Sequence, residues 1–207
     1  MVKNKIGVAL IGSGRAGMIH AHNFRGSVPG AVIAAVCDPV VEAAKAAAEA
    51  LELDNYYTDY KDVLALDNID AVIVATPTKY HCEIVCAAAK AGKHILCEKP
   101  MAMSVEECDI MDKTAKENGV TLQIAFMRRF DASFAAAKEM VDAGEIGDVV
   151  MVRSNTRGPS IPKPWMYDIS KSNGPLAEVC SHDIDSLRWF TGADFKTVYA
   201  IGGNYRC

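Results

Sequence analysis

Three glycines near the N-terminus have the spacing of a phosphate-binding turn. Gly12, Gly14 and Gly17 form the pattern G-x-G-x-x-G directly after the apolar run Ile6–Ile11 and before a segment with helical character. The first glycine permits a tight turn, the second lets a pyrophosphate approach the backbone, and the third lets the helix pack on the strand. Free N–H groups and the helix dipole stabilise an anion there. The pattern therefore predicts a dinucleotide-binding turn, with an ordinary tight turn as the alternative. The other residues of this turn are Ser13, Arg15 and Ala16.

An acidic residue closes the next apolar run, at the distance expected for recognition of a ribose. Asp38 follows Ala31–Cys37 and lies about twenty residues after the glycine turn. A carboxylate in this place accepts hydrogen bonds from the adenosine ribose hydroxyls and repels a 2′-phosphate. The sequence therefore predicts NAD as the cofactor, with NADP disfavoured. The alternative is that Asp38 caps the helix predicted for Val40–Leu51, which the sequence permits equally well.

Strands and helices alternate over the first 125 residues. The predicted strands are Ile6–Ile11, Ala31–Cys37, Asn55–Thr58, Ala71–Ala75, His94–Cys97 and Val120–Ala125. The predicted helices are Ala16–Phe24, Val40–Leu51, Asp59–Leu66, Lys79–Ala91 and one that Ser104 caps and that runs to Asn118. This alternation predicts an α/β fold with a doubly wound parallel sheet, in which ligands bind at the carboxyl ends of the strands. The residues that directly follow predicted strand ends include Gly12, Asp38, Thr76, Glu98 and Phe126.

The alternation stops beyond Phe126. The later segments are a helix over Asp131–Ala143, a β-rich run over Asp148–Thr156, a loop over Gly158–Gly174 that carries Trp165, a helix over Leu176–Phe190 and a strand over Lys196–Arg206. We therefore predict two domains. Residues 1–123 form a Rossmann domain, and residues 124–207 form the start of a smaller α+β domain.

Composition and charge exclude several classes of protein. Half of the 207 residues are hydrophobic and 23% are charged, which predicts a packed globule. The net charge is −4 and no basic run is present, so we expect no nucleic-acid partner. No apolar stretch approaches the roughly twenty residues that span a bilayer. The first residues run directly into the first predicted strand, so we expect no signal peptide and a cytoplasmic protein.

The cysteines do not form a recognisable framework. Seven are scattered along the chain, an odd number that suits reduced thiols better than disulfides. Cys82 and Cys86 can share a helix face beside His81, but no second pair of ligands at zinc-like spacing accompanies them. We therefore predict no metal site.

Five motifs follow one another along the chain. They are residues 11–17 (IGSGRAG), 69–81 (IDAVIVATPTKYH), 91–100 (AGKHILCEKP), 126–131 (FMRRFD) and 174–185 (GPLAEVCSHDID). In combination they resemble the glucose–fructose oxidoreductase / inositol dehydrogenase (Gfo/Idh/MocA) family. The resemblance covers essentially the whole chain, and Glu98-Lys99-Pro100 is its most specific part.

The resemblance implies an enzyme of two domains, a Rossmann domain that binds NAD(P) and a second domain with a mostly antiparallel sheet. The implied reaction moves a hydride between nicotinamide and a secondary alcohol or ketone of a sugar, inositol or related polyol. The second-domain sheet often makes the contact of a homo-oligomer. Family members are usually longer, which suggests a C-terminally shortened member. The alternatives are a dinucleotide-binding regulator without turnover and an inactive shortened product, and the joint presence of Lys99 and His182 favours the enzyme.

The resemblance also implies roles for individual residues. Lys99 is the catalytic lysine, which can act as a base where burial and a nearby positive nicotinamide favour its neutral form. His182 hydrogen-bonds the reacting hydroxyl or relays its proton, and Glu178, one helical turn earlier on the same predicted face, orients it. The alternatives are a surface Lys-Pro turn and a solvated His–Glu pair. For Arg128 the alternative to a cofactor contact is a salt bridge between domains. The expected cofactor-binding residues outside the glycine turn and Asp38 are Thr76, Pro77, Thr78, His81, Glu98, Lys99 and Arg128.

Overall fold

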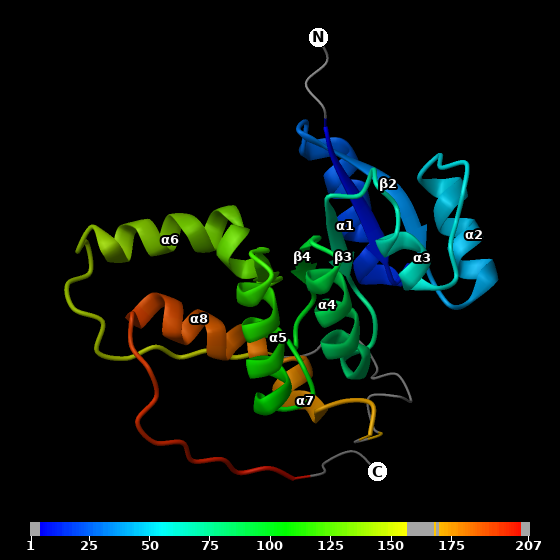
Figure 1. Ribbon diagram of the computed structural model, residues 1–207. Helices are drawn as coiled ribbons and strands as arrows, with labels where there is room; N and C mark the ends of the chain where they lie inside the picture. The colour runs from blue at the N-terminus through cyan, green and yellow to red at the C-terminus, as the bar shows by residue number, and fades with distance from the viewer. Residues whose placement is uncertain (1–4, 157–167, 169, 204–207) are drawn as a thin grey trace. The chain divides into compact units, whose positions relative to one another are not determined.

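The structure is a computed structural model that describes residues 5–156, 168 and 170–203 (Figure 1). Trp165 and most of the loop predicted for Gly158–Gly174 lie outside the described residues. The described residues group into two compact units. The first unit comprises residues 5–125, 168 and 170–178, and the second comprises residues 126–156 and 179–203.

The first unit is built on a parallel sheet of five strands. The strands are β1 (Ile6–Ile11), β2 (Ala31–Cys37), β3 (Ala71–Val74), β4 (His94–Cys97) and β5 (Leu122–Ile124). Their order in space is β2-β1-β3-β4-β5, and every neighbouring pair is parallel. The chain places β2 on one side of β1 and then crosses to place β3 on the other side. This is a doubly wound sheet, so the predicted α/β class is confirmed.

The first unit also contains helices, most of which connect the strands. They are α1 (Arg15–Ser27), α2 (Val41–Ala50), α3 (Tyr60–Leu64), η1 (Thr78–Tyr80, a 3-10 helix), α4 (His81–Lys90), α5 (Val105–Glu117) and α7 (Gly174–Glu178). The predicted cap of α5 is present, since the Ser104 side chain accepts a hydrogen bond from Glu107 N. Gly92 and Gly119 follow α4 and α5 with φ of 72° and 66°, as expected for helices that end on a glycine.

Both faces of the sheet are buried, because alternate residues of the strands enter two separate cores. Val8 and Leu10 pack with α1 and α2, whereas Ala9 and Ile11 pack with α3, α4 and α5. A bulge in β2 shifts the register between Val8 and Ala9 of β1. Burial on both faces explains why the strands appear in the sequence as continuous apolar runs.

The strand predicted over Asn55–Thr58 is wrong. Only Tyr57 pairs there, in an isolated parallel bridge with Cys37 at the edge of β2. The side chain of Asp59 accepts a hydrogen bond from Lys61 N at 2.9 Å and caps α3. The helix therefore begins before a ladder can extend, and the sheet has five strands instead of the predicted six.

The second unit contains η2 (Met127–Phe130), α6 (Ala132–Asp142) and α8 (Ser181–Thr191). The strands predicted over Asp148–Thr156 and Lys196–Arg206 do not form within the described residues. A strand is stable only when its backbone groups pair with a neighbour, and no ladder in the described part of the chain includes either segment. A β-rich pattern alone cannot supply that neighbour.

The single helix predicted over Leu176–Phe190 is also wrong. It is divided into α7, which ends at Glu178, and α8, which begins at Ser181. The carbonyl oxygen of Glu178 accepts a hydrogen bond from Lys99 Nζ at 2.7 Å. This long-range contact uses the carbonyl that would accept from His182 N in a continuous helix. Glu178 and His182 therefore do not share a helical face, and the expected orientation of His182 by Glu178 loses its basis.

Candidate functional site

The glycine turn joins β1 to α1, and two of its glycines are required by close backbone contacts. Gly12 has φ of +96°, and a Cβ there would lie 2.6 Å from Ala75 O. A Cβ on Gly17 would lie 2.0 Å from Gly12 O. Side chains cannot be accommodated at either position without moving backbone. Gly12 therefore permits the turn, and Gly17 permits the close packing of α1.

Gly14 differs from the other two glycines because it faces open space. No atom lies within 4 Å of a Cβ built on it, and its φ of −66° would suit any residue. Gly14 is the N-cap of α1, no side chain caps this end, and the first turn carries no acidic residue. The first N–H groups of a helix have no partner within the helix. The open end of α1 therefore fits a pyrophosphate, and with it a dinucleotide such as NAD.

Asp38 links the end of β2 to the glycine turn. Its Oδ2 accepts hydrogen bonds from Ser13 N at 3.0 Å and Ser13 Oγ at 2.9 Å, and its Oδ1 accepts from Val40 N at 3.0 Å. The N-cap of α2 is Val40 and no side chain caps this helix, so Asp38 does not cap it as the alternative expected. The carboxylate is only half-buried and keeps acceptor capacity for a ribose hydroxyl.

The ends of β1 and β3 meet where the order of the strands reverses. In sheets of this kind the ligand lies in the crevice at that reversal. A Cβ added at Gly12 would meet the backbone of Ala75 and Thr76 there. The Thr76 side-chain oxygen is buried and has no hydrogen-bond partner among the described residues. Pro77 is exposed at the same turn, whereas Thr78 is buried. An unsatisfied buried hydroxyl at this crevice is consistent with a polar ligand.

His81 fastens this turn to the segment after β4. The ring is 1% exposed, with Nε2 2.9 Å from Thr76 O and Nδ1 2.9 Å from Pro100 O. A neutral imidazole donates to only one of these carbonyls, and an imidazolium donates to both. His81 therefore connects the turn at Thr76 to the segment at Pro100, and it does more than cap a helix.

Glu98 and Lys99 follow β4 at the same edge, and Glu98 has a partner that the sequence did not predict. His20 Nε2 on α1 lies 2.8 Å from Glu98 Oε1, and Lys99 N donates to Glu98 Oε2 at 3.0 Å. The helical periodicity of the sequence indicates which way His20 faces, because His20 lies between Gly17 and Ala21, the buried residues of α1. That spacing turns His20 toward the sheet, but it cannot identify a partner 78 residues away.

The surroundings of Glu98 favour its ionised form. Burial acts to raise the pKa of this carboxyl, but the hydrogen bond and charge of His20, with the amide and charge of Lys99, hold it below the usual value. The carboxylate is therefore a fixed negative group beside Lys99.

The Lys99 side chain is half-buried and directed to the end of α7. Its Nζ donates to Glu178 O at 2.7 Å, which occupies one of the three ammonium donors. The Glu178 carboxylate is buried and accepts a hydrogen bond from Thr78 Oγ1 at 3.3 Å. The first unit thus brings together the glycine turn, the Thr76–Thr78 turn and Lys99 with its Glu178 contact.

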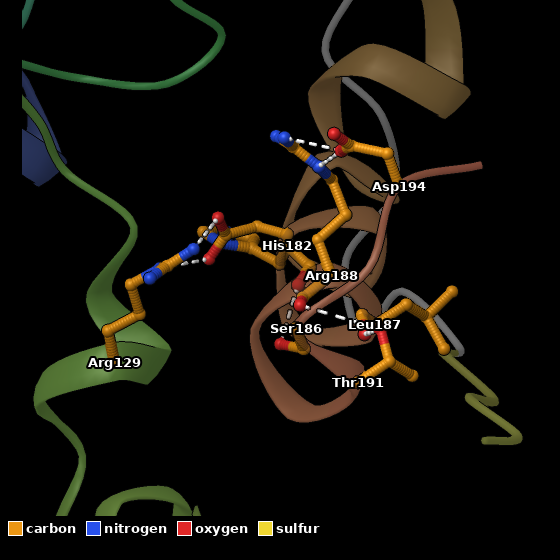
Figure 2. Close-up of polar contacts among 8 residues, drawn as sticks. Arg129, His182, Ser186, Leu187, Arg188, Thr191 and Asp194 are labelled. Carbon is orange, nitrogen blue, oxygen red and sulfur yellow. Dashed lines mark hydrogen bonds and ion pairs between the residues drawn. The ribbon is translucent and has the colours of Figure 1, made fainter. Parts of the chain in front are cut away.

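Two arginines of the second unit are paired with carboxylates of α8. Arg128 Nη1 lies 2.7 Å from Asp183 Oδ1, and Arg129 donates to both oxygens of Asp185 at 2.9 and 2.8 Å (Figure 2 shows Arg129 on η2 facing α8). Both pairs lie within this unit. Arg128, expected at the cofactor, therefore already has a protein partner.

Asp183 is the more strongly anchored of these two carboxylates. Thr156 Oγ1 donates to it at 2.7 Å, and Ser154 Oγ donates as well. Burial acts to raise the pKa of Asp183, but the hydrogen bonds from Arg128, Ser154 and Thr156 lower it to about 2. Asp183 is therefore ionised at neutral pH, and its carboxylate holds η2 and residues 154–156 against α8.

His182 lies on α8, in the second unit, in its first turn. Its carbonyl oxygen accepts a hydrogen bond from Ser186 Oγ at 2.7 Å, within the same helix (Figure 2). Lys99 and Glu178 lie in the first unit.

In the described part of the chain, every helix is too short or too polar to span a membrane. Among the same residues, no three His, Cys, Asp or Glu side chains are grouped in a way that would hold a metal ion.

The doubly wound sheet and the glycine turn define a dinucleotide-binding Rossmann domain. Residues 6–126 match the family model described as "Oxidoreductase family, NAD-binding Rossmann fold", and residues 134–206 match the "GFO/IDH/MocA C-terminal domain". The chain therefore belongs to the Gfo/Idh/MocA oxidoreductase family, whose Rossmann domain binds NAD.

Known relatives cover nearly the whole chain. It is 38% identical over 201 residues to scyllo-inositol 2-dehydrogenase (NAD(+)) of Bacillus subtilis, covering 97% of this chain and 58% of that protein. It is 35% identical over 195 residues to myo-inositol 2-dehydrogenase of Thermotoga maritima, covering 94% and 58%. The crystal structure of scyllo-inositol dehydrogenase from Lactobacillus casei with NAD(H) and scyllo-inositol has a TM-score of 0.80 at 32% identity, covering 91% and 56%. The chain thus spans somewhat more than half the length of these relatives.

Proposed function

We propose that the protein is an NAD-dependent dehydrogenase that acts on a secondary alcohol of inositol or a related cyclic polyol. The observation that carries the proposal is the half-buried Lys99 ammonium, held by Glu178 O in the unit that also contains the open glycine turn. The similarity to inositol dehydrogenases supports the substrate class.

The cofactor would be held along the carboxyl edge of the sheet. Gly14 and the first turn of α1 would bind the pyrophosphate, and Asp38 would bind the adenosine ribose and disfavour a 2′-phosphate. The buried Thr76 hydroxyl and the Glu98 carboxylate are the polar groups available at the nicotinamide end. When bound, NAD supplies the acceptor for the hydride of the alcohol carbon.

Lys99 is the residue that we infer removes the hydroxyl proton. A general base must reach the proton that it takes, and it must hold a free electron pair. The contact with Glu178 O fixes the position of Nζ, and in the neutral amine it would leave one N–H group and the free electron pair for the substrate. His182 would hydrogen-bond the reacting hydroxyl, whereas Glu178 would act by fixing Lys99 and Thr78. This role of Glu178 replaces the one expected from a shared helical face. Arg128, which pairs with Asp183, would stabilise the first turn of α8 in the second unit.

The test combines cofactor binding with turnover. Purified protein is titrated with NADH and NADPH by fluorescence, and oxidation of scyllo-inositol, myo-inositol and other polyols is followed by NADH absorbance. We expect tighter binding of NADH than of NADPH. Lys99→Met should keep NADH binding but lose about a hundredfold or more of kcat, the size of a general-base contribution. Lys90→Met is the control, because Lys90 is an exposed residue in the last turn of α4.

Each contrary result has a definite meaning. Binding of NADH without turnover of any polyol would favour a dinucleotide-binding regulator or an inactive product. Equal rates for Lys99→Met and Lys90→Met would contradict the role of Lys99. Assembly into a homo-oligomer is part of the proposal as well, and light scattering coupled to size-exclusion chromatography measures it directly.

A further inference from the structure

The hydrogen bond between His20 and Glu98 joins two parts of the first unit that the proposed reaction uses separately. His20 lies on α1, the helix that begins at the glycine turn, and Glu98 directly precedes Lys99. The two side chains are 20% and 18% exposed, and Nε2 lies 2.8 Å from Oε1. The contact is therefore neither at the surface nor fully buried, and it is shielded enough from water to keep a fixed geometry.

The carboxylate of Glu98 uses its two oxygens for two different parts of the chain. Oε1 accepts from His20, whereas Oε2 accepts from the backbone N–H of Lys99 at 3.0 Å. Hydrogen bonds to an ionised group are shorter and stronger than neutral ones, and they fix direction as well as distance. Without His20, the Glu98 carboxylate would lose one of these two hydrogen bonds and would be held less firmly as the acceptor of the Lys99 amide.

The position of Lys99 Nζ depends on that backbone. The Lys99 side chain extends from its backbone to Glu178 O, so the backbone of residue 99 must keep a defined orientation for the 2.7 Å contact to form. Displacement of a reacting group by about 1 Å can lower a rate about a hundredfold. A residue that holds the Lys99 backbone can therefore affect the rate without touching a substrate.

We propose that His20 is a positioning residue of this site, which holds Lys99 in place through the Glu98 carboxylate and couples it to the helix that begins at the glycine turn. This inference rests on the proposed function. The competing interpretation is an ordinary ion pair that contributes only to the stability of the fold, which is common for pairs of this exposure.

The test uses four variants of the chain. His20→Leu removes the donor, His20→Asn is polar but too short to reach Glu98, and His20→Gln keeps an N–H near the place of Nε2. His22→Gln is the control, since His22 lies on the same helix and is exposed. Two readouts are measured for each variant. They are kcat and KM for the polyol that the wild type oxidises, and the rate at which an amine-acylating reagent labels Lys99 relative to the exposed Lys90, followed by mass spectrometry.

The expected result separates positioning from folding. His20→Leu and His20→Asn should lower kcat by about tenfold to a hundredfold, with a much smaller change in KM, and should label Lys99 several-fold faster. His20→Gln should restore most of both readouts, and His22→Gln should match the wild type. If His20→Leu does not fold, His20→Asn gives the same comparison.

Several outcomes would overturn the inference. If His20→Leu and His20→Asn have the same kcat and the same Lys99 labelling rate as His22→Gln, His20 does not position Lys99. Equal losses in His20→Gln and His20→Leu would show that the donor is not what matters. If the wild type oxidises no polyol, the proposed function fails, but labelling still decides the role of His20. Faster labelling that His20→Gln reverses supports it, and unchanged labelling refutes it.

Discussion

Replacing the glycines of the turn one at a time should separate folding from cofactor binding. A Cβ at Gly17 would lie 2.0 Å from Gly12 O, and a Cβ at Gly12 would lie 2.6 Å from Ala75 O. Both neighbours are backbone atoms, so they cannot rotate away. Overpacking of this kind costs about 1–3 kcal/mol. At Gly12, the φ of +96° adds strain of about 1–3 kcal/mol. We therefore expect Gly17→Ala to lower the free energy of unfolding by about 1–3 kcal/mol. Gly12→Ala, which adds the backbone strain, should lower it by about 2–6 kcal/mol.

Gly14→Ala should behave in the opposite way. With φ of −66° and no atom within 4 Å of the added Cβ, the free energy of unfolding should change by less than about 1 kcal/mol. The methyl group would occupy the space that a pyrophosphate needs. Loss of one hydrogen bond to a charged group costs about 1.5–3 kcal/mol. The Kd for NADH should therefore rise about tenfold to a hundredfold.

Urea unfolding followed by circular dichroism and NADH titration followed by fluorescence measure the two effects. Gly26→Ala is the matched control, because Gly26 lies on the same helix and a Cβ there also meets no atom within 4 Å. The reasoning is refuted if Gly14→Ala is destabilised as much as Gly17→Ala. It is also refuted if Gly14→Ala binds NADH as tightly as Gly26→Ala does.

Two further predictions concern the carboxylates of α8 and its end. Asp185→Asn should lower the free energy of unfolding by about 1–3 kcal/mol, because Asp185 is buried and accepts two hydrogen bonds from Arg129. Asp194→Asn is the control, because Asp194 is an exposed partner of Arg188, and it should change the free energy of unfolding by no more than about 1 kcal/mol. Equal effects of Asp185→Asn and Asp194→Asn in denaturant unfolding would contradict the argument. For Asp183, whose pKa is lowered from 3.8 to about 2, the stabilisation is fully present above pH 3.8 and is lost as the pH falls through about 2. The stability difference between wild type and Asp183→Asn should therefore narrow over that range, and a constant difference in urea midpoints would show that the charge is not responsible.

Local patterns in the sequence were sufficient for the framework of the first unit. The apolar runs of β1 and β2, the glycine spacing and the caps of the helices each reflect forces between near neighbours in the chain. Gly17 is an example, because the atom that a Cβ there would meet, Gly12 O, belongs to the same turn. Four of the five family motifs include or follow the end of a strand of this sheet, and the fifth, residues 174–185, covers α7 and the start of α8.

The contacts that shape the candidate site were decided only by the tertiary structure. His20 and Glu98 are 78 residues apart, and Thr78 and Glu178 are 100 residues apart, so no periodicity relates them. The same applies to the division between α7 and α8, where Lys99 takes the carbonyl of Glu178. A hydrogen bond across the fold competes with the local one, and only the folded chain determines which of them forms.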